Sequence, residues 1–290
     1  MINRLAVIGV GLIGGSLARA MRERRMVQEI VGVGRDERNL QRAVELGVID
    51  SYTFDFATAV SVADLVVVAT TLGATRDVFR RLAAHLSASA IVTDVGSVKA
   101  SVIDDARATL GPHFARFVPG HPIAGGEKSG VEAATADLFE RHRVILTPVN
   151  ETDPAALATM REIWTRVGAT VSDMEASHHD AVLAATSHLP HVLAYALVDC
   201  LAGMSDSGAI FDFAAGGFRD FTRIASSNPD MWRDIALANR AALSRACSTF
   251  IATFSALQRA IDNSDGDALH AHFARAKQAR DAYLSGLTKK

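Results

Sequence analysis

Cysteine is scarce in this chain of 290 residues, and neither sign of charge is in clear excess. Cys200 and Cys247 are its two cysteines, and both stand in apolar stretches with helical spacing, where we expect buried, reduced thiols. The formal net charge is −2, so no basic surface for nucleic acid is expected. These absences argue against a disulfide-stabilised secreted scaffold and a nucleic-acid-binding protein, and they favour a cytoplasmic location.

Long hydrophobic runs are also lacking. No segment offers the roughly 18 uncharged apolar residues that a membrane-spanning helix needs, so we expect no association with a membrane. The apolar run at residues 5–13 is broken by glycines and leads directly into a more polar helix, which is not the pattern of a signal peptide.

Apolar residues make up 49% of the chain, enough for a large core, and the length suggests two domains. Residues 1–173 alternate short β-branched runs with helical stretches, which predicts an α/β domain with a Rossmann-type, doubly wound parallel sheet. The expected strands cover residues 4–9, 29–33, 64–69 and 91–94, and three more at 117–119, 143–148 and 170–172 extend the same sheet. The expected helices cover residues 12–24 and 75–86, and one that stops at Gly47.

The pattern changes after Asp173, because apolar residues then recur at helical spacing and no convincing strand follows. We predict an all-α domain over residues 174–290, with a long helix at 176–202 that Pro190 kinks. Its apolar stripes exceed what a lone helical hairpin can cover, so we expect a homodimer built through this domain. The alternative is that these stripes pack within one subunit.

A glycine-rich run, Gly9-Val10-Gly11-Leu12-Ile13-Gly14, links the first expected strand to the first helix. In that position a G-x-G-x-x-G motif predicts a dinucleotide site. The first glycine permits the tight turn, the second admits the pyrophosphate, and the third allows close packing of helix on strand. The free N–H groups of the helix then face the phosphates. A glycine-rich turn without a ligand is the alternative.

The end of the second strand bears on the choice of cofactor. NAD enzymes usually carry an acid here that binds the ribose 2′-hydroxyl, but this chain has Gly34 followed by Arg35. An arginine can pair with a 2′-phosphate, so NADP is favoured. Asp36 keeps NAD open, since a shift of one residue would place its carboxylate on the ribose.

Ligands in such sheets bind beyond the carboxyl ends of the strands, where Thr70, Thr71 and Asp94 are expected beside the cofactor. His121 lies at a further strand end among glycines, and Ser97 from the neighbouring strand end could orient it. A neutral imidazole suits a general base, in which case activity should rise with pH as His121 loses its proton. From these residues alone, a structural histidine remains the alternative.

Six ordered motifs carry a resemblance over nearly the whole chain. They are GVGLIGGS (Gly9–Ser16), DVGSVK (Asp94–Lys99), GHPIAGGEKSG (Gly120–Gly130), SHLPH (Ser187–His191), GGFRDFTRIA (Gly216–Ala225) and MWRDI (Met231–Ile235). In this set the chain resembles the prephenate and arogenate (cyclohexadienyl) dehydrogenases of tyrosine biosynthesis. The resemblance implies oxidative decarboxylation of prephenate, arogenate or both with NAD(P)+, which yields 4-hydroxyphenylpyruvate or tyrosine.

The resemblance also implies roles for individual residues. His121 matches the catalytic histidine and Ser97 its hydrogen-bonding partner, while Arg223 matches the arginine that anchors the anionic substrate. His191 matches a further substrate-side residue. A polar network near the entrance, partly donated by a second subunit, is matched by Glu127, Asp220 and Trp232.

Several alternatives stay open. His188 and His191 could be a metal pair, although no third ligand is evident and we expect no metal. Arg223 could form a structural ion pair with Asp220, and Trp232 could belong to the core. The whole chain could instead be a β-hydroxyacid or imine reductase, or a non-catalytic dinucleotide sensor. Gly126, where some relatives carry a side chain, leaves the choice between prephenate and arogenate open.

Overall fold

The structure is a computed structural model that describes residues 1–126 and 128–287. It divides into two compact units, residues 1–240 and residues 241–290, and each is described by itself.

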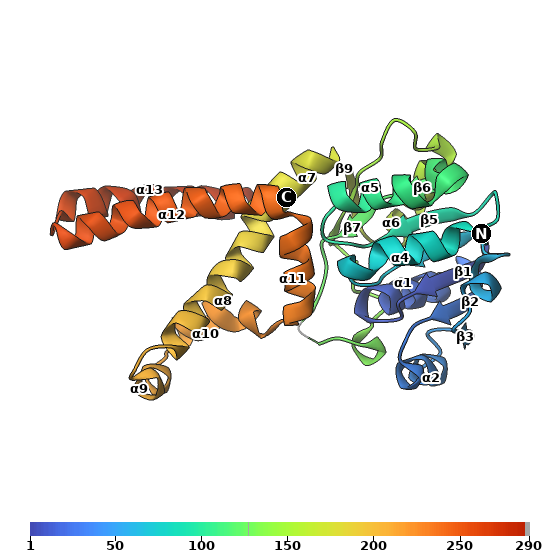
Figure 1. Ribbon diagram of the computed structural model, residues 1–290, viewed down its shortest axis with the longest axis horizontal. Helices are drawn as coiled ribbons and strands as arrows, with labels where there is room; N and C mark the ends of the chain where they lie inside the picture. Colours follow the sequence, from blue (N-terminus) through green and yellow to red (C-terminus); the bar gives the residue numbers. More distant parts are fainter. Residues whose placement is uncertain (127, 288–290) are drawn as a thin grey trace. The chain divides into compact units, whose positions relative to one another are not determined.

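A six-stranded parallel sheet is the centre of the first unit (Figure 1), with the strand order β3-β2-β1-β4-β5-β6. This order reverses direction between β1 and β4, as in a doubly wound Rossmann sheet, so the predicted fold class is confirmed. The strands are β1 (Ile2–Ile8), β2 (Val27–Val33), β3 (Ser51–Thr53), β4 (Leu65–Val68), β5 (Ile91–Asp94) and β6 (Phe117–Val118).

Both faces of this sheet are covered, because alternate residues of a strand point to opposite sides. In β1, Leu5 and Val7 join one apolar core, while Ala6 and Ile8 join the other. The helices that pack on these faces are α1 (Leu12–Glu23), α2 (Glu37–Glu45), α3 (Phe56–Val60), α4 (Leu72–Ala83), α5 (Ala100–Thr109) and α6 (Pro154–Arg166). Gly47 follows α2 with a φ of 65°, as the predicted glycine stop requires.

Two of the expected strands do not extend the main sheet, and this part of the prediction is wrong. β8 (Arg143–Leu146) and β9 (Thr170–Asp173) form a separate three-stranded sheet with β7 (Gly120–Pro122). β7 runs antiparallel to β8 and places His121 opposite Ile145. Strand propensity identifies such segments, but it does not specify which partner they pair with.

The long helix expected at residues 176–202 is continuous but not uniform. It comprises α7 (Ala176–Leu183), a π-helical turn (Ala184–His188) and α8 (Leu189–Ala202), with Pro190 in the first turn of α8. Pro190 has no N–H to donate to the preceding turn of the helix. The π turn directly before it has a wider hydrogen-bond pattern, which lets the helix continue past the proline.

By length and composition this helix, Ala176–Ala202, could cross a membrane, so the expectation that no segment is long and apolar enough is wrong. Of its most apolar window, 22% is buried within the chain. Such a composition also suits a helix whose apolar surface is covered by another protein subunit.

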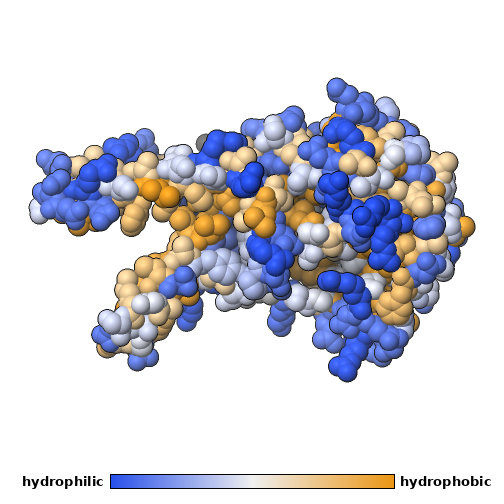
Figure 2. Space-filling view, viewed as in Figure 1, coloured by the Kyte–Doolittle hydropathy of each residue, from blue (hydrophilic) through white to orange (hydrophobic). Residues whose placement is uncertain are grey.

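The first unit ends with α9 (Ser207–Asp212), α10 (Gly216–Thr222) and α11 (Pro229–Ala238). The second unit contains α12 (Arg240–Asp262) and α13 (Gly266–Leu287), and many of its apolar side chains are exposed, including Ile251 and Phe254 at 62% and 58%. Figure 2 shows apolar side chains at the surface of α8 and of α12.

Both cysteines are free, but the prediction that they are buried is wrong, since Cys200 is exposed and Cys247 half-buried.

Candidate active site

The glycine-rich loop has the geometry of a dinucleotide site. Gly9 has a φ of 100°, and a Cβ there would lie 2.5 Å from the carbonyl oxygen of Ala69. A Cβ on Gly14 would collide with the Gly9 carbonyl, whereas one on Gly11 would meet nothing within 4 Å. Gly11 is also the N-cap of α1 and supplies no side-chain hydrogen bond to the helix. The open space over Gly11 and the uncapped helix N-terminus fit the pyrophosphate of a nicotinamide dinucleotide.

At the end of β2, Asp36 and Arg35 have different surroundings. The Asp36 carboxylate caps α2, accepting hydrogen bonds from the backbone N–H groups of Arg38 and Asn39 at 3.0 and 3.4 Å. Arg35 is exposed. The carboxylate that would favour NAD therefore already serves as a helix cap.

Asn39, which the sequence analysis did not single out, ties the glycine loop to the segment beyond His121. Its Nδ2 donates to the carbonyl of Val10 at 2.7 Å, and its Oδ1 accepts from the backbone N–H of Val131 at 3.1 Å. The Asn39 side chain therefore joins the glycine loop at Val10 to the segment at Val131 through two hydrogen bonds.

The strand ends hold the other residues expected at the cofactor. Thr71 is the N-cap of α4, and the hydroxyl of Thr70 is buried without a hydrogen-bond partner among the described residues. A bound ligand would satisfy such a hydroxyl.

Asp94 does not fit its expected role, because its side chain is enclosed by protein groups. The carboxylate lies 2.5 Å from Lys99 Nζ and accepts from the backbone N–H groups of Gly96 and Gly120 at 2.8 and 3.2 Å. Lys99 Nζ also donates to the carbonyl of Gly120 at 2.7 Å. Asp94 and Lys99 therefore fix the backbone next to His121 rather than presenting a carboxylate to the cofactor.

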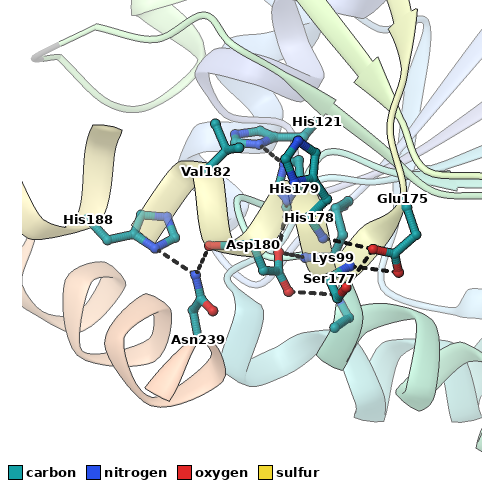
Figure 3. Close-up of polar contacts among 12 residues, drawn as sticks. Lys99, His121, Glu175, Ser177, His178, His179, Asp180, Val182, His188 and Asn239 are labelled. Carbon is teal, nitrogen blue, oxygen red and sulfur yellow. Dashed lines mark hydrogen bonds and ion pairs between the residues drawn. The ribbon is translucent and has the colours of Figure 1, made fainter. Parts of the chain in front are cut away.

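His121 lies in β7 with 8% of its surface exposed. Its Nδ1 is 2.8 Å from Nε2 of His179 in α7, and His179 Nδ1 is 2.8 Å from Oδ1 of Asp180 (Figure 3). No hydrogen bond joins Ser97 to His121 in the described part of the chain, so the expected orienting partner is replaced by His179. Among the described residues, no hydrogen bond is made by His121 Nε2.

The surroundings of His121 keep its imidazole neutral. Burial lowers its pKa well below 6.5, and the nearby charge of Lys99 lowers it further, with His179 and His188 acting in the same direction. At neutral pH the side chain can therefore accept a proton, as a general base must.

A third buried histidine, His188, lies in the π turn. Its Nδ1 accepts a hydrogen bond from Nδ2 of Asn239 at 3.1 Å, and the same Asn239 Nδ2 donates to the carbonyl of Asp180 at 2.8 Å (Figure 3). Burial lowers the pKa of His188 to about 4. His188 and Asn239 thus connect α11 to the helix that carries His179.

We predict that His188 makes the protein sensitive to acid. The unfolded chain protonates this histidine near pH 6.5 and the folded chain near 4, so its contribution is complete above 6.5 and is lost as pH falls towards 4. The loss at pH 4.5 is about 2 to 3 kcal/mol. Urea unfolding at pH 7.0 and 4.5 should show a smaller decrease for His188→Gln than for the unaltered protein. Equal decreases would contradict the prediction.

A cavity of about 740 Å³ is lined by His191 of α8, the helix that follows the π turn, although His121 is not among its described lining residues. Its lining includes Leu12 of the glycine loop, Gly125, Gly126, Lys128, His191 and Arg223. None of the described lining residues is acidic, and two are cationic. Such a lining suits a small substrate with more than one negative charge.

The remaining expected residues divide into three cases. Trp232 stacks on His191, with ring centroids 3.7 Å apart, and so packs against a residue that lines the cavity. Asp220 is exposed and is not among the described lining residues. Glu127 lies outside the described residues. Lys128, by contrast, lines the cavity and was missed, because one lysine in a loop gives no pattern in the sequence.

No group of three potential metal ligands occurs among residues 1–126 and 128–287. In the pair His188 and His191 one ring nitrogen of each is engaged, since His188 Nδ1 bonds to Asn239 and His191 Nδ1 bonds to the carbonyl of Ser187 at 2.8 Å.

Comparison with known proteins agrees with this geometry. Residues 17–173 match the prephenate dehydrogenase nucleotide-binding domain, and residues 175–275 match the prephenate dehydrogenase dimerization domain. The chain is 40% identical to the cyclohexadienyl dehydrogenase of Zymomonas mobilis, over 97% of this chain and 96% of that protein. The chain belongs to the prephenate dehydrogenase family.

Two solved structures of this family resemble the chain over nearly its full length. Prephenate dehydrogenase from A. aeolicus, in complex with hydroxyphenyl propionate and NAD+, has a TM-score of 0.91 and 37% identity, and covers 98% of this chain and 99% of its own. Arogenate dehydrogenase from Synechocystis has a TM-score of 0.80 and 31% identity, with 97% and 99% covered. This prephenate dehydrogenase homologue is therefore an NAD(P)-dependent oxidoreductase, and its apolar helix at Ala176–Ala202 falls within the matched dimerization domain.

Proposed function

We propose that this chain oxidises and decarboxylates prephenate, arogenate or both, with His121 as the general base and Arg223 as an anion anchor. The observation that carries this proposal is the cavity of about 740 Å³, which Leu12 of the cofactor loop and Arg223 line together. A substrate there would lie next to the cofactor and next to a cation. The hydroxyphenyl propionate bound by the A. aeolicus relative has a hydroxyl on its ring and a carboxylate, as this arrangement requires.

The reaction requires two things of the protein: it must position the substrate against the cofactor, and it must supply one proton acceptor. Nicotinamide, when bound, accepts the hydrogen and electron pair that leave ring carbon C4. His121 Nε2 accepts the proton of the C4 hydroxyl as the C4 ketone forms. The C1 carboxylate then leaves as carbon dioxide, its bonding electrons complete the aromatic ring, and the C4 oxygen, now a phenolate, takes its proton back from His121. Holding the reactants together in the cavity supplies much of the remaining rate enhancement.

Two cations fit a substrate with two carboxylates. Arg223 can bind one carboxylate with both arms of its guanidinium, whereas Lys128 offers a point charge to the other. Arg223 also lowers the pKa of His191, after the larger effect of burial, which is consistent with both side chains facing the same space.

NADP is the cofactor that the end of β2 favours. Asp36 is occupied as a helix cap, and Arg35 is exposed beside it. Arg35→Ala should raise the KM for NADP by about tenfold or more, because a charge-assisted contact with a 2′-phosphate is lost, and leave the KM for NAD unchanged. Arg42→Ala is the control, since that arginine already pairs with Glu45 and Glu132. Equal effects on both cofactors would exclude a 2′-phosphate role for Arg35.

The exposed apolar residues of the helical region fit a homodimer, in which a second copy covers them. This assignment is supported by the matched dimerization domain and by the exposure of Ile251, Phe254 and Phe273. Sedimentation equilibrium should give about twice the chain mass, and a monomer at micromolar concentration would contradict it.

A steady-state assay of all four substrate–cofactor pairs tests the proposed activity. We expect carbon dioxide release in step with reduced cofactor, at least with prephenate. Reduction without decarboxylation would point to a hydroxyacid dehydrogenase, and cofactor binding without turnover of either substrate would point to a sensor.

A further inference from the structure

A continuous chain of hydrogen bonds runs from the catalytic histidine to the N-terminus of a helix. Asp180 accepts from three groups: Oδ1 from the backbone N–H of Lys99 at 2.8 Å and from His179 Nδ1 at 2.8 Å, and Oδ2 from the N–H of Ala100 at 2.9 Å. His179 Nε2 then meets His121 Nδ1 at 2.8 Å. His121, His179 and Asp180 are all buried.

The proton positions along this chain follow from its fixed end. An ionised carboxylate only accepts hydrogen bonds, so His179 Nδ1 carries a proton. In neutral His179 the other nitrogen, Nε2, is then an acceptor, so His121 Nδ1 must donate to it. In neutral His121 the remaining nitrogen, Nε2, carries a lone pair and no proton. Nε2 is also the nitrogen for which residues 1–126 and 128–287 supply no hydrogen-bond partner.

We propose that His179 and Asp180 are positioning residues that hold His121 in the tautomer with a bare Nε2, ready to accept the substrate's hydroxyl proton. When His121 becomes protonated, His179 Nε2 continues to accept from Nδ1, and Asp180 holds His179 in place. The substrate's proton is held on His121 until aromatisation turns the C4 oxygen into a phenolate, which takes it back, so no transfer on to His179 or Asp180 is needed. The inference rests on the proposed function of His121 and names the residues that make it effective.

The surroundings fix Asp180 more firmly than a surface carboxylate. It accepts two N–H groups at the start of α5, where the helix dipole favours a negative charge. The neighbouring cation, Lys99, is engaged by Asp94 and by the Gly120 carbonyl and is not a partner of the imidazoles. On the other side, Asn239 binds the Asp180 carbonyl. The carboxylate is therefore held by backbone groups at the start of α5, and the backbone of Asp180 is held by Asn239.

Replacing His179 with a residue that cannot accept a hydrogen bond should leave His121 in place but no longer hold it in the tautomer with a bare Nε2. His179→Leu should lower kcat by about 100-fold or more and leave the substrate KM within threefold, since loss of a carboxylate that orients a catalytic histidine costs about 10⁴ in serine proteases. His179→Gln, whose amide oxygen can accept from His121 Nδ1, should recover most of that activity. The matched control is His178→Gln, the exposed neighbour on the same helix, which should be unaffected.

A double variant separates positioning from a merely structural role. If His179 acts only through His121, then His121→Asn with His179→Leu should be no slower than His121→Asn alone, because residues that act as a unit are not additive. Additive losses, or a His179→Leu enzyme as active as His178→Gln, would overturn the proposal.

Histidine ¹⁵N NMR of the folded protein tests the tautomer without any turnover. We expect His121 to show a protonated Nδ1 and a bare Nε2, and His179→Leu to abolish this preference. A protonated Nε2 in the unaltered protein would overturn the positioning role of His179 and Asp180 even if the enzyme is active. If the tautomer is as expected but the protein turns over neither substrate, the proposed function is overturned and the positioning role of His179 and Asp180 is supported.

Discussion

Replacing His121 with asparagine should lower kcat by about 10²- to 10⁴-fold, which is the usual contribution of general base catalysis. Asparagine keeps a polar side chain of similar reach, but its amide does not accept a proton at neutral pH. Cofactor affinity should be unchanged, because the residues proposed to bind the cofactor lie in the glycine loop and at the end of β2, not in β7. Stopped-flow measurement of hydride transfer and fluorescence titration of the reduced cofactor would separate the two effects.

The pH profile gives this prediction a second test. The active form of His121 is neutral, so activity should be full above its pKa and fall below it. Because burial and Lys99 lower that pKa, kcat/KM should stay level from pH 8 to below 6.5 and decline only at more acidic pH. The asparagine variant should lose this acidic limb. A kcat that is unchanged in the variant, or a limb that survives in it, would remove His121 from the mechanism.

The position of His121 was predictable from sequence, but its partner was not. A histidine among glycines after a β-branched run signals a strand end, and parallel strands bring their carboxyl ends together. His179 lies 58 positions later in another element. A signal did exist, because His178, His179 and Asp180 interrupt an otherwise apolar helix. Helical periodicity alone does not show which of these polar groups point inward.

The fold shows a similar division between local and long-range information. Five of the six strands of the main sheet were expected from local sequence patterns, whereas the short edge strand β3 (Ser51–Thr53) was not. The second sheet was not expected, because the antiparallel pairing of β7 with β8 depends on contacts between segments more than 20 residues apart. The enclosure of Asp94 was not predictable for the same reason: its partner Lys99 is near in sequence, but the burial of the pair is tertiary.

Arg223→Ala should raise the substrate KM by about ten- to over a hundredfold while kcat changes much less. A charge-assisted hydrogen bond to a carboxylate contributes roughly 1.5–3 kcal/mol, which corresponds to that range. The arginine lines the same cavity as Lys128, so one cation remains and binding should weaken rather than vanish. Initial rates over a wide range of prephenate concentration would measure the change in KM.

Matched variants decide whether the loss reflects recognition of a carboxylate. Arg223→Lys keeps the charge but loses the two-armed geometry, so its KM should fall between those of the unaltered enzyme and Arg223→Ala. Arg219→Ala removes an exposed arginine of α10 that is not among the described lining residues, and it should leave KM unchanged. If Arg223→Ala binds substrate normally but unfolds at a lower temperature, the arginine is structural. The anchor for the substrate's carboxylates would then have to be Lys128, the other cation in the described lining.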